Sequence, residues 1–528
     1  MGPPNRGPSV RPTPEESNPL SAPVERAERF PFLLVGMLLV AASGLRLLGA
    51  NHDLWLDEVW SVFIATRVHS LGDVFLLHHE INHPLNTLWV AWLGPGAPAA
   101  VYHAFPLACG IASVAVAAMI GWRRGRAAAW IATIPIGFSY ELIAFSAEAR
   151  GYAPLVLFSL LSYHFMEAYV RRPRRRLAGL YALCAVMGLL AHPAFAAFLG
   201  AATLGCLYRF CAGRNVGEAL RRTIACQGVP LAVLAVLYAV DYRHVVVGGG
   251  TPIQSLGFVL LEGLAWSLGA PTGDVWVGLF GSIALFGLGW GLFNLVREQS
   301  DRWLFFAAAT MGFPVFLILA RNSDYVYTRH LMVGTTFLLI LWGDLLAGLW
   351  SRGRSARAVC LGLLAAYVGF NGWHVADWAV NGRGQPGALV RHVVLHAGGA
   401  FETIGSDSDF RVGAIVDYYR QGLPEAKNVR YLMKNNRPPT GPDWMITHAE
   451  SWTPSAAPPS EWRDARGNRY RWVRTFRTAP LSGLHLFLYR NNSVRPPIPA
   501  EQTAEAGAAG GRRMESGVSA GPPLRDSP

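Results

Sequence analysis

Long apolar runs separated by short polar connections make up the first two-thirds of the chain. A run of roughly 17 to 25 apolar residues is long enough to cross the hydrocarbon core of a bilayer as a helix. The pattern predicts eleven such runs between residues 30 and 373, at about 31–49, 100–120, 127–145, 153–170, 177–191, 194–212, 223–240, 275–296, 303–320, 330–350 and 356–373. The chain is therefore predicted to be an α-helical polytopic membrane protein with about eleven transmembrane helices.

The pattern changes at about residue 374, where polar residues and prolines become frequent. The stretches FRVGAIVDYY (410–419) and LHLFLY (484–489) are short and apolar or alternating, which is typical of β-strands. We expect a small α/β domain over residues 374–492. The segments 1–29 and 493–528 are rich in residues that do not build a core, and they are predicted to be disordered tails.

Composition supports the membrane assignment. Of the 528 residues, 52% are hydrophobic and only 15% are charged, whereas soluble domains contain about 25% charged residues. A single soluble core and a coiled coil are excluded. The net charge of +12 does not indicate nucleic-acid binding, because membrane proteins concentrate arginine and lysine in cytoplasmic loops.

The cysteines and the N-terminal segment add two expectations. The six cysteines lie in or beside apolar runs without a CxxC pair, so neither a disulfide framework nor a thiolate metal site is predicted. Residues 1–29 lack the short apolar core of a cleavable signal peptide. The first apolar run is therefore expected to remain as a membrane anchor.

Arginine distribution predicts the orientation. If the N-terminal tail is cytoplasmic, the inner loops hold seventeen arginines, and the outer connections hold only Arg67, Arg150, Arg243, Arg321 and Arg329. Positive residues are enriched on the cytoplasmic side of a membrane. We therefore expect a multi-pass protein of the inner (plasma) membrane with a cytoplasmic N-terminus and a C-terminal domain outside.

The first outer loop, residues 50–99, contains the first candidate site. It has no long apolar run but contains four tryptophans, which suit helices lying at the membrane surface. Asp57 and Glu58 begin one such helix, and carboxylates at the rim of a low-dielectric cavity can accept a proton from a hydroxyl group. We predict them to be catalytic. The alternative is that Asp57 only caps the helix.

Other polar side chains are predicted to gather on the same outer side. Guanidinium groups bind phosphate oxygens in a bidentate manner, so outer arginines are candidates for holding a lipid phosphate. The alternatives are snorkelling to ordinary headgroups, a structural ion pair, or simple packing. The predicted substrate-binding residues are His83, Glu148, Arg150, His192, Arg321, Tyr327 and Arg329.

One motif favours a different chemistry. His79-Glu80-Ile81-Asn82-His83 matches HExxH, in which two histidines one helical turn apart bind zinc. However, Pro84 follows directly, and proline disfavours the helical conformation for the residue before it. We therefore expect no zinc protease, and no metal ligand is predicted.

Four segments carry a family resemblance: LRLLGANHDLWLDEVWSV (45–62), NHPLNTLWV (82–90), YELIAFSAEARGYAPL (140–155) and YTRHLMVGTTFLLIL (327–341). In this order and spacing they resemble the GT-C class of integral-membrane glycosyltransferases, in particular bacterial relatives of protein mannosyltransferases and of lipid A aminoarabinose transferases. The resemblance spans roughly residues 30–375. Two departures are that one proline of the usual His-Pro-Pro-Leu is missing at His83-Pro84-Leu85, and that Arg329-His330 replaces the frequent Arg-Tyr.

The resemblance implies an enzyme that transfers a sugar from a polyprenyl-phosphate donor to a lipid, glycan or protein acceptor of the cell envelope. It implies that the acidic residue of the first outer loop, Asp57, is catalytic, with Glu58 beside it. No cofactor is expected, because arginines can stabilise a departing lipid phosphate. Membrane lipids are the remaining expected partners, and nucleic acid is not one.

Two other classes stay open at this level. A transporter would carry ionisable groups near the middle of several spans, and here Arg46, Glu262 and Asp344 lie near the ends of the apolar runs. A non-catalytic envelope-assembly protein would not require Asp57. Loss of turnover in an Asp57→Asn variant that still folds distinguishes a transferase from both.

Overall fold

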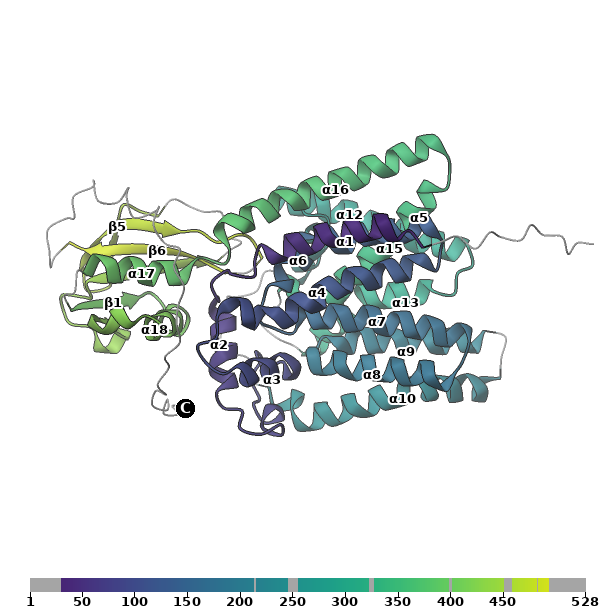
Figure 1. Cartoon of the computed structure of the whole chain (residues 1–528), viewed down its shortest axis with the longest axis horizontal. Coiled ribbons are helices and arrows are strands. Elements are labelled where there is room, and N and C mark those ends of the chain that lie inside the picture. Colours follow the sequence, from purple (N-terminus) through teal and green to yellow (C-terminus); the bar gives the residue numbers. More distant parts are fainter. Residues whose placement is uncertain are drawn as a thin grey trace, which may run out of the picture.

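The computed structural model describes residues 30–212, 215–245, 255–321, 327–397, 401–450, 458–481 and 483–492. These residues form a long helical bundle with a smaller α/β domain at one end (Figure 1). The chain is thus a polytopic helical membrane protein with a small C-terminal mixed sheet. The tails predicted to be disordered, residues 1–29 and 493–528, lie outside the described residues.

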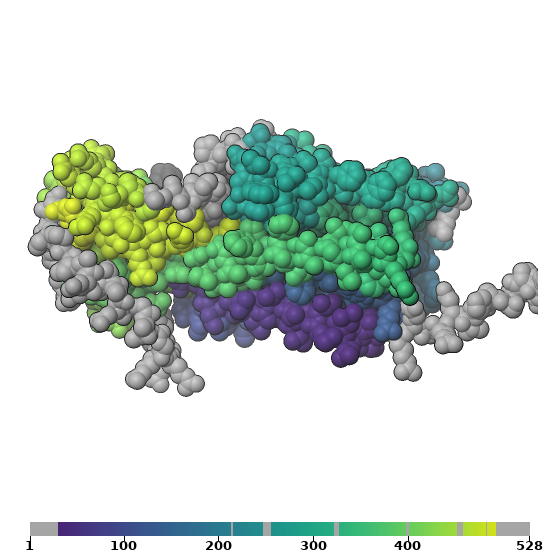
Figure 2. Space-filling view, turned by 90° about the horizontal axis from the view of Figure 1, so that it is seen from above, coloured from purple at the N-terminus to yellow at the C-terminus, as the bar shows by residue number. Residues whose placement is uncertain are grey.

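Every apolar run that was predicted to cross the membrane is helical. Figure 2 shows one face of the bundle, on which α16 (green) lies between α1 (purple) and α12 (teal). The bundle elements are α1 (Phe32–Leu47), α4 (Ala99–Trp122), α5 (Arg126–Phe138), α6 (Tyr140–Ser146), α7 (Tyr152–Arg171), α8 (Arg175–Ala191), α9 (Phe195–Cys211), α10 (Val216–Val240), η2 (Tyr242–His244), α11 (Leu256–Ser267), α12 (Asp274–Arg297), α13 (Trp303–Ala307), η3 (Ala308–Gly312), α14 (Phe313–Arg321), η4 (Thr328–Leu331), α15 (Met332–Trp350) and α16 (Arg354–Asn381).

The number of membrane-length helices is smaller than the eleven predicted. Within the described residues, seven helices are long and apolar enough to cross a membrane, or eight if the bent pair α5 and α6 is one span. Three predicted spans, α1, α8 and α9, have only 16 or 17 residues, which is at the short limit for a crossing. In addition, the short apolar helix α11 occupies a region that was expected to be an outer connection.

The run predicted as one helix over 127–145 is broken. Its two halves, α5 and α6, meet at an angle of 63° at Ser139, whose hydroxyl accepts a hydrogen bond from the Leu142 amide. A break leaves carbonyl groups at the end of α5 without helical partners. The fully buried Arg46 of α1 donates to two of them, on Gly137 at 2.7 Å and Ile136 at 3.0 Å. The bend is thereby stabilised from a neighbouring helix.

The first outer loop contains no membrane-length helix among its residues, as predicted. It forms α2 (Leu56–Ala65), the single turn η1 (Asp73–Phe75) and α3 (Pro84–Leu93). Helix α2 begins where expected, with Asp57 and Glu58 in its first turn. Both helices pack under the C-terminal domain at the end of the bundle (Figure 1).

The C-terminal domain contains a six-stranded sheet in the order β2-β1-β3-β6-β5-β4, in which β2, β1 and β3 are parallel and the other pairs are antiparallel. Helix α16 continues to Asn381, beyond the expected boundary at 374, before the elements of the domain begin. They are α17 (Pro386–Ala397), β1 (Glu402–Ser406), η5 (Asp409–Gly413), α18 (Ala414–Gln421), η6 (Pro424–Asn428), β2 (Val429–Tyr431), η7 (Lys434–Asn436), β3 (Trp444–Glu450), β4 (Glu461–Arg463), β5 (Arg469–Phe476) and β6 (Leu484–Asn491).

One of the two predicted strands is wrong. LHLFLY forms most of β6, as expected, but residues 410–419 form the helical segment η5 and α18. The buried residues Val412, Ile415 and Val416 are separated by three and four positions, which places them on one face of a helix. This helical spacing outweighs the local abundance of β-forming residues, because the sheet offers α18 an apolar surface to cover.

The domain is attached to the bundle by hydrogen bonds as well as by packing. Tyr419 donates to the carbonyl oxygen of Leu54 at 2.9 Å, and the Gly387 amide donates to Asp53 at 2.8 Å. Trp55 and Leu56 at the start of α2 belong to the same apolar cluster as the buried face of the sheet. The C-terminal domain therefore fixes the position of the segment that carries Asp57.

Candidate functional site

Asp57 lies between two arginines that come from distant parts of the chain. Its carboxylate oxygen Oδ2 is 2.7 Å from Nη1 of Arg150, in the connection between α6 and α7, and 3.4 Å from Nη1 of Arg329, in η4. The Asp57 side chain is 14% exposed. It can therefore be reached from outside, whereas its neighbouring carboxylates cannot.

Both arginines hold their guanidinium groups against aromatic rings. Arg150 lies 5.0 Å from the centre of the Tyr152 ring, and Arg329 lies 4.5 Å from that of Tyr327 and 6.0 Å from that of Trp55. In each arginine the Nε atom is buried and has no hydrogen-bond partner among the described residues. Each therefore retains a donor that an anion entering beside Asp57 could use.

Glu58 is fully buried, which corrects its predicted catalytic role to a positioning role. Its Oε1 accepts hydrogen bonds from His103 Nε2 at 2.8 Å and from the Ala149 amide at 2.7 Å, and its Oε2 accepts one from the Trp55 amide at 3.1 Å. Burial opposes its ionisation, but His103 and Arg383 outweigh burial and lower the pKa of Glu58. Glu58 thus joins the start of α2 to α4 and to the 147–151 connection as a carboxylate.

Glu148 is equally buried. Its Oε1 accepts a hydrogen bond from Trp55 Nε1 at 3.2 Å, and its Oε2 lies 3.6 Å from Arg383 Nη2. Burial raises the pKa of Glu148, although Arg383 and Arg150 oppose this shift. Glu148 therefore contacts Arg150 and Trp55 rather than an open cavity, and we assign it to supporting the site.

Arg383 was missed by sequence reasoning. It is fully buried, and it donates to the carbonyl oxygens of Ala147 at 2.8 Å and Ala144 at 2.6 Å. It follows the end of α16 in a polar connection, where nothing in the local pattern marks it as buried. His103 was also missed, although a histidine inside an apolar run is a recognisable signal.

His83 and His192 stack on each other beside this cluster. Their ring centres are 4.5 Å apart, and the Tyr152 ring lies 4.9 Å from that of His192. Burial and the nearby Arg150 lower the pKa of His83, so it is neutral at physiological pH. Since Tyr152 also contacts Arg150, the two histidines support the arginine from the side of α3 and α8.

Seven of the nine predicted site residues thus form one contiguous group with Asp57 and Arg150: Glu58, His83, Glu148, Arg150, His192, Tyr327 and Arg329 surround Asp57 directly or through one neighbour. The ninth, Arg321, is the last residue of α14, and its side chain lies outside the described part of the structure.

The HExxH segment is not helical. A turn covers His79–Ile81, and α3 begins at Pro84, with His83 in an extended conformation as its N-cap. The prediction that Pro84 prevents zinc-ligand geometry is confirmed. Among the described residues, no group of three or more histidine, cysteine, aspartate and glutamate side chains is placed to hold a metal ion.

A variant tests this interpretation. His79→Ala should leave turnover within about twofold of the wild type and should not change the metal content, because a zinc site needs ligands on one helical face. Metal analysis of the purified protein measures the second quantity. Stoichiometric zinc that disappears with His79 would contradict the geometry described above.

Comparison with protein-family models and with curated proteins finds no match for this chain.

Proposed function

We propose that the chain is a membrane glycosyltransferase that moves a sugar from a polyprenyl-phosphate donor to an acceptor of the cell envelope. The observation that carries the proposal is the placement of Asp57 between Arg150 and Arg329, partly exposed, at the end of the bundle next to the C-terminal domain. A carboxylate and two cations at one point are what such a transfer requires. The GT-C resemblance of the four segments supports the same reaction.

In the proposed reaction Asp57 takes the proton of an acceptor hydroxyl. The acceptor oxygen forms a bond to the anomeric carbon of the sugar, and the bond from that carbon to the phosphate oxygen breaks. The bonding electrons leave with the polyprenyl phosphate, which gains one negative charge. An oxocarbenium-like centre develops between the two bonds.

The two arginines couple these charge changes. Once Asp57 is protonated, its attraction for Arg150 and Arg329 falls, while the negative charge on the leaving phosphate rises. The guanidinium charge then becomes available to the phosphate at the moment when it is needed, which is stabilisation of the developing charge. Both arginines also carry an unused buried Nε donor.

Arg329→Ala should weaken donor binding as well as turnover. A charged hydrogen bond to the lipid phosphate contributes roughly 1.5 to 3 kcal/mol, and the phosphate is charged before and after transfer. Equilibrium binding of a polyprenyl-phosphate sugar to the full chain measures this loss. Arg329→Lys is the matched control and should recover part of the affinity, whereas unchanged donor affinity in Arg329→Ala would remove Arg329 from the proposed phosphate site.

We also propose eleven membrane crossings, with the C-terminal domain outside the cytoplasm and the short helices α1, α8 and α9 completing the count. The argument is that arginine-rich connections meet at one end of the bundle: Arg124 and Arg302 both pair with Asp344, and Arg209 pairs with Asp301. The Asp57 cluster and the domain lie at the other end.

Reporter fusions test this topology. Fusions after residues 124 and 174 should report a cytoplasmic position, and a fusion after Gly382, where α16 ends, should report the opposite side. Cytoplasmic activity at Gly382 would place the Asp57 cluster on the wrong side of the membrane for a polyprenyl-phosphate donor that faces outward.

The reaction itself is tested with the purified full chain. Incubation with a polyprenyl-phosphate sugar and an envelope extract should yield a glycosylated lipid, glycan or protein detectable by mass spectrometry, with release of polyprenyl phosphate. Neither product should form with Asp57→Asn. Transfer that is equal in both proteins would reject the proposed function.

A further inference from the structure

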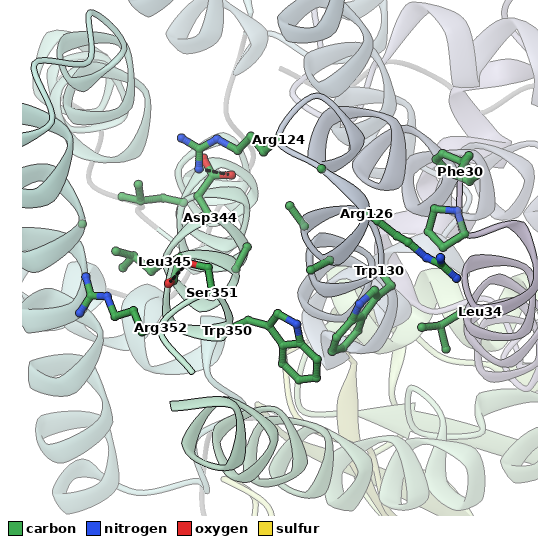
Figure 3. A pocket seen from close by; sticks show the side chains of 18 of the residues that line it. Phe30, Leu34, Arg124, Arg126, Trp130, Asp344, Leu345, Trp350, Ser351 and Arg352 are labelled. Carbon is green, nitrogen blue, oxygen red and sulfur yellow. Dashed lines mark hydrogen bonds and ion pairs between the residues drawn. The ribbon is translucent and has the colours of Figure 1, made fainter. Parts of the chain in front are cut away.

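A large cavity lies at the end of the bundle opposite to the C-terminal domain. Its volume is about 1090 Å³, and it is formed by the start of α1, the start of α5 and the ends of α12 and α15 (Figure 3). Pockets for drug-sized ligands measure about 300 to 1,000 Å³. The cavity is therefore large enough for a polar headgroup together with part of a long apolar chain.

Most of the cavity wall is apolar. Trp130 of α5 and Trp350 of α15 meet edge to face at 5.1 Å on one side of it. The other apolar lining residues come from α1, α12 and α15 and include Phe30, Leu34, Met37, Leu295, Leu341 and Leu345. Gly348 of α15 contributes to the opening, since a Cβ atom placed there would meet nothing within 4 Å.

Basic side chains surround one part of this apolar wall. Arg124 pairs with Asp344 at 2.7 Å, so these two charges offset each other (Figure 3). Arg126 and Arg352 are exposed and also line the cavity, opposed only by the exposed Glu298 among its charged lining residues. The Arg352 guanidinium has no hydrogen-bond or ion-pair partner within the described ranges. The cavity thus presents two surface cations beside a hydrophobic groove.

We propose that this cavity binds an anionic diacyl phospholipid, with the phosphate between Arg126 and Arg352 and one acyl chain along the apolar wall. Basic pockets between transmembrane helices bind anionic lipid headgroups in other membrane proteins. The cavity lies at the far end of the bundle from Asp57, so it assigns a resident lipid of the opposite leaflet rather than the sugar donor. The proposal does not depend on the glycosyltransferase activity.

Filling the cavity tests the site. Gly348→Trp places a large side chain in the opening, and Gly362→Trp is the matched control, since Gly362 of α16 is exposed, also meets nothing within 4 Å and does not line the cavity. Native mass spectrometry of the full chain in detergent counts bound phosphatidylglycerol. Gly348→Trp should lose at least tenfold in affinity and Gly362→Trp should equal the wild type; equal binding in both variants would overturn the proposal.

A second variant tests the headgroup contact without filling the cavity. Each basic residue near an anionic lipid contributes roughly fivefold to binding, so Arg126→Gln combined with Arg352→Gln should reduce phosphatidylglycerol affinity by roughly 30-fold. Phosphatidylcholine with the same acyl chains should bind weakly to the wild type and should be little affected by the change. Equal wild-type affinity for the two lipids, or displacement of phosphatidylglycerol by an equal concentration of polyprenyl phosphate, would overturn the assignment.

Discussion

Asp57→Asn should lower kcat by about 100-fold or more, the usual scale of general base catalysis. Asparagine keeps the size of aspartate and one oxygen that can accept from Arg150, so the cluster should still form, but it cannot take a proton from the acceptor. Among the three carboxylates of the cluster, only Asp57 is partly exposed, since Glu58 and Glu148 are fully buried. Donor binding should be largely preserved, because both arginines remain.

The matched control is Asp73→Asn in the same outer loop. Asp73 is exposed and accepts hydrogen bonds only from its local neighbours His69 and Ser70. Its replacement should leave kcat unchanged. Turnover and donor affinity measured on the full chain separate the chemical step from donor binding, and near-normal turnover of Asp57→Asn with normal donor binding would disprove the role of Asp57.

Arg383→Met should destabilise the protein by about 3–5 kcal/mol, the cost of leaving a buried charge without its partner. Arg383 and Glu148 are both fully buried, and Arg383 also satisfies two carbonyl groups at the end of α6. Arg383→Lys should lie between the variant and the wild type, since a lysine keeps the charge but not the two-pronged geometry. Thermal unfolding of the full chain measures the loss.

The same variant predicts a pH dependence. Burial already raises the pKa of Glu148, and Arg383 is the largest opposing influence. Without Arg383 the pKa of Glu148 rises further, so the folded state binds a proton that the unfolded state releases at neutral pH. Because stability then increases as pH falls, the difference from the wild type should shrink between about pH 8 and about pH 5. The exposed Arg430→Met variant in β2 is the control, and a loss as small as that of Arg430→Met would show that the buried pair is dispensable.

The helical bundle could be predicted because long apolar runs have one stable arrangement in a bilayer. Every predicted span is helical, and the start of α2 at Asp57 was predicted from its position after the first span. The count of membrane-length helices was not predictable in the same way. The break at Ser139 depends on Arg46 reaching the end of α5 from another helix, and no local pattern records that contact.

The sequence by itself determined that Asp57, Arg150 and Arg329 belong to outer connections, because charge distribution along the chain decides on which side each connection lies. It did not determine that the three side chains touch, since residues 93 and more positions apart meet only when the helices pack. It also left Glu58 and Asp57 equivalent. Tertiary structure separated them, because burial among His103, Trp55 and Ala149 makes one carboxylate a structural anchor and leaves the other open to a substrate.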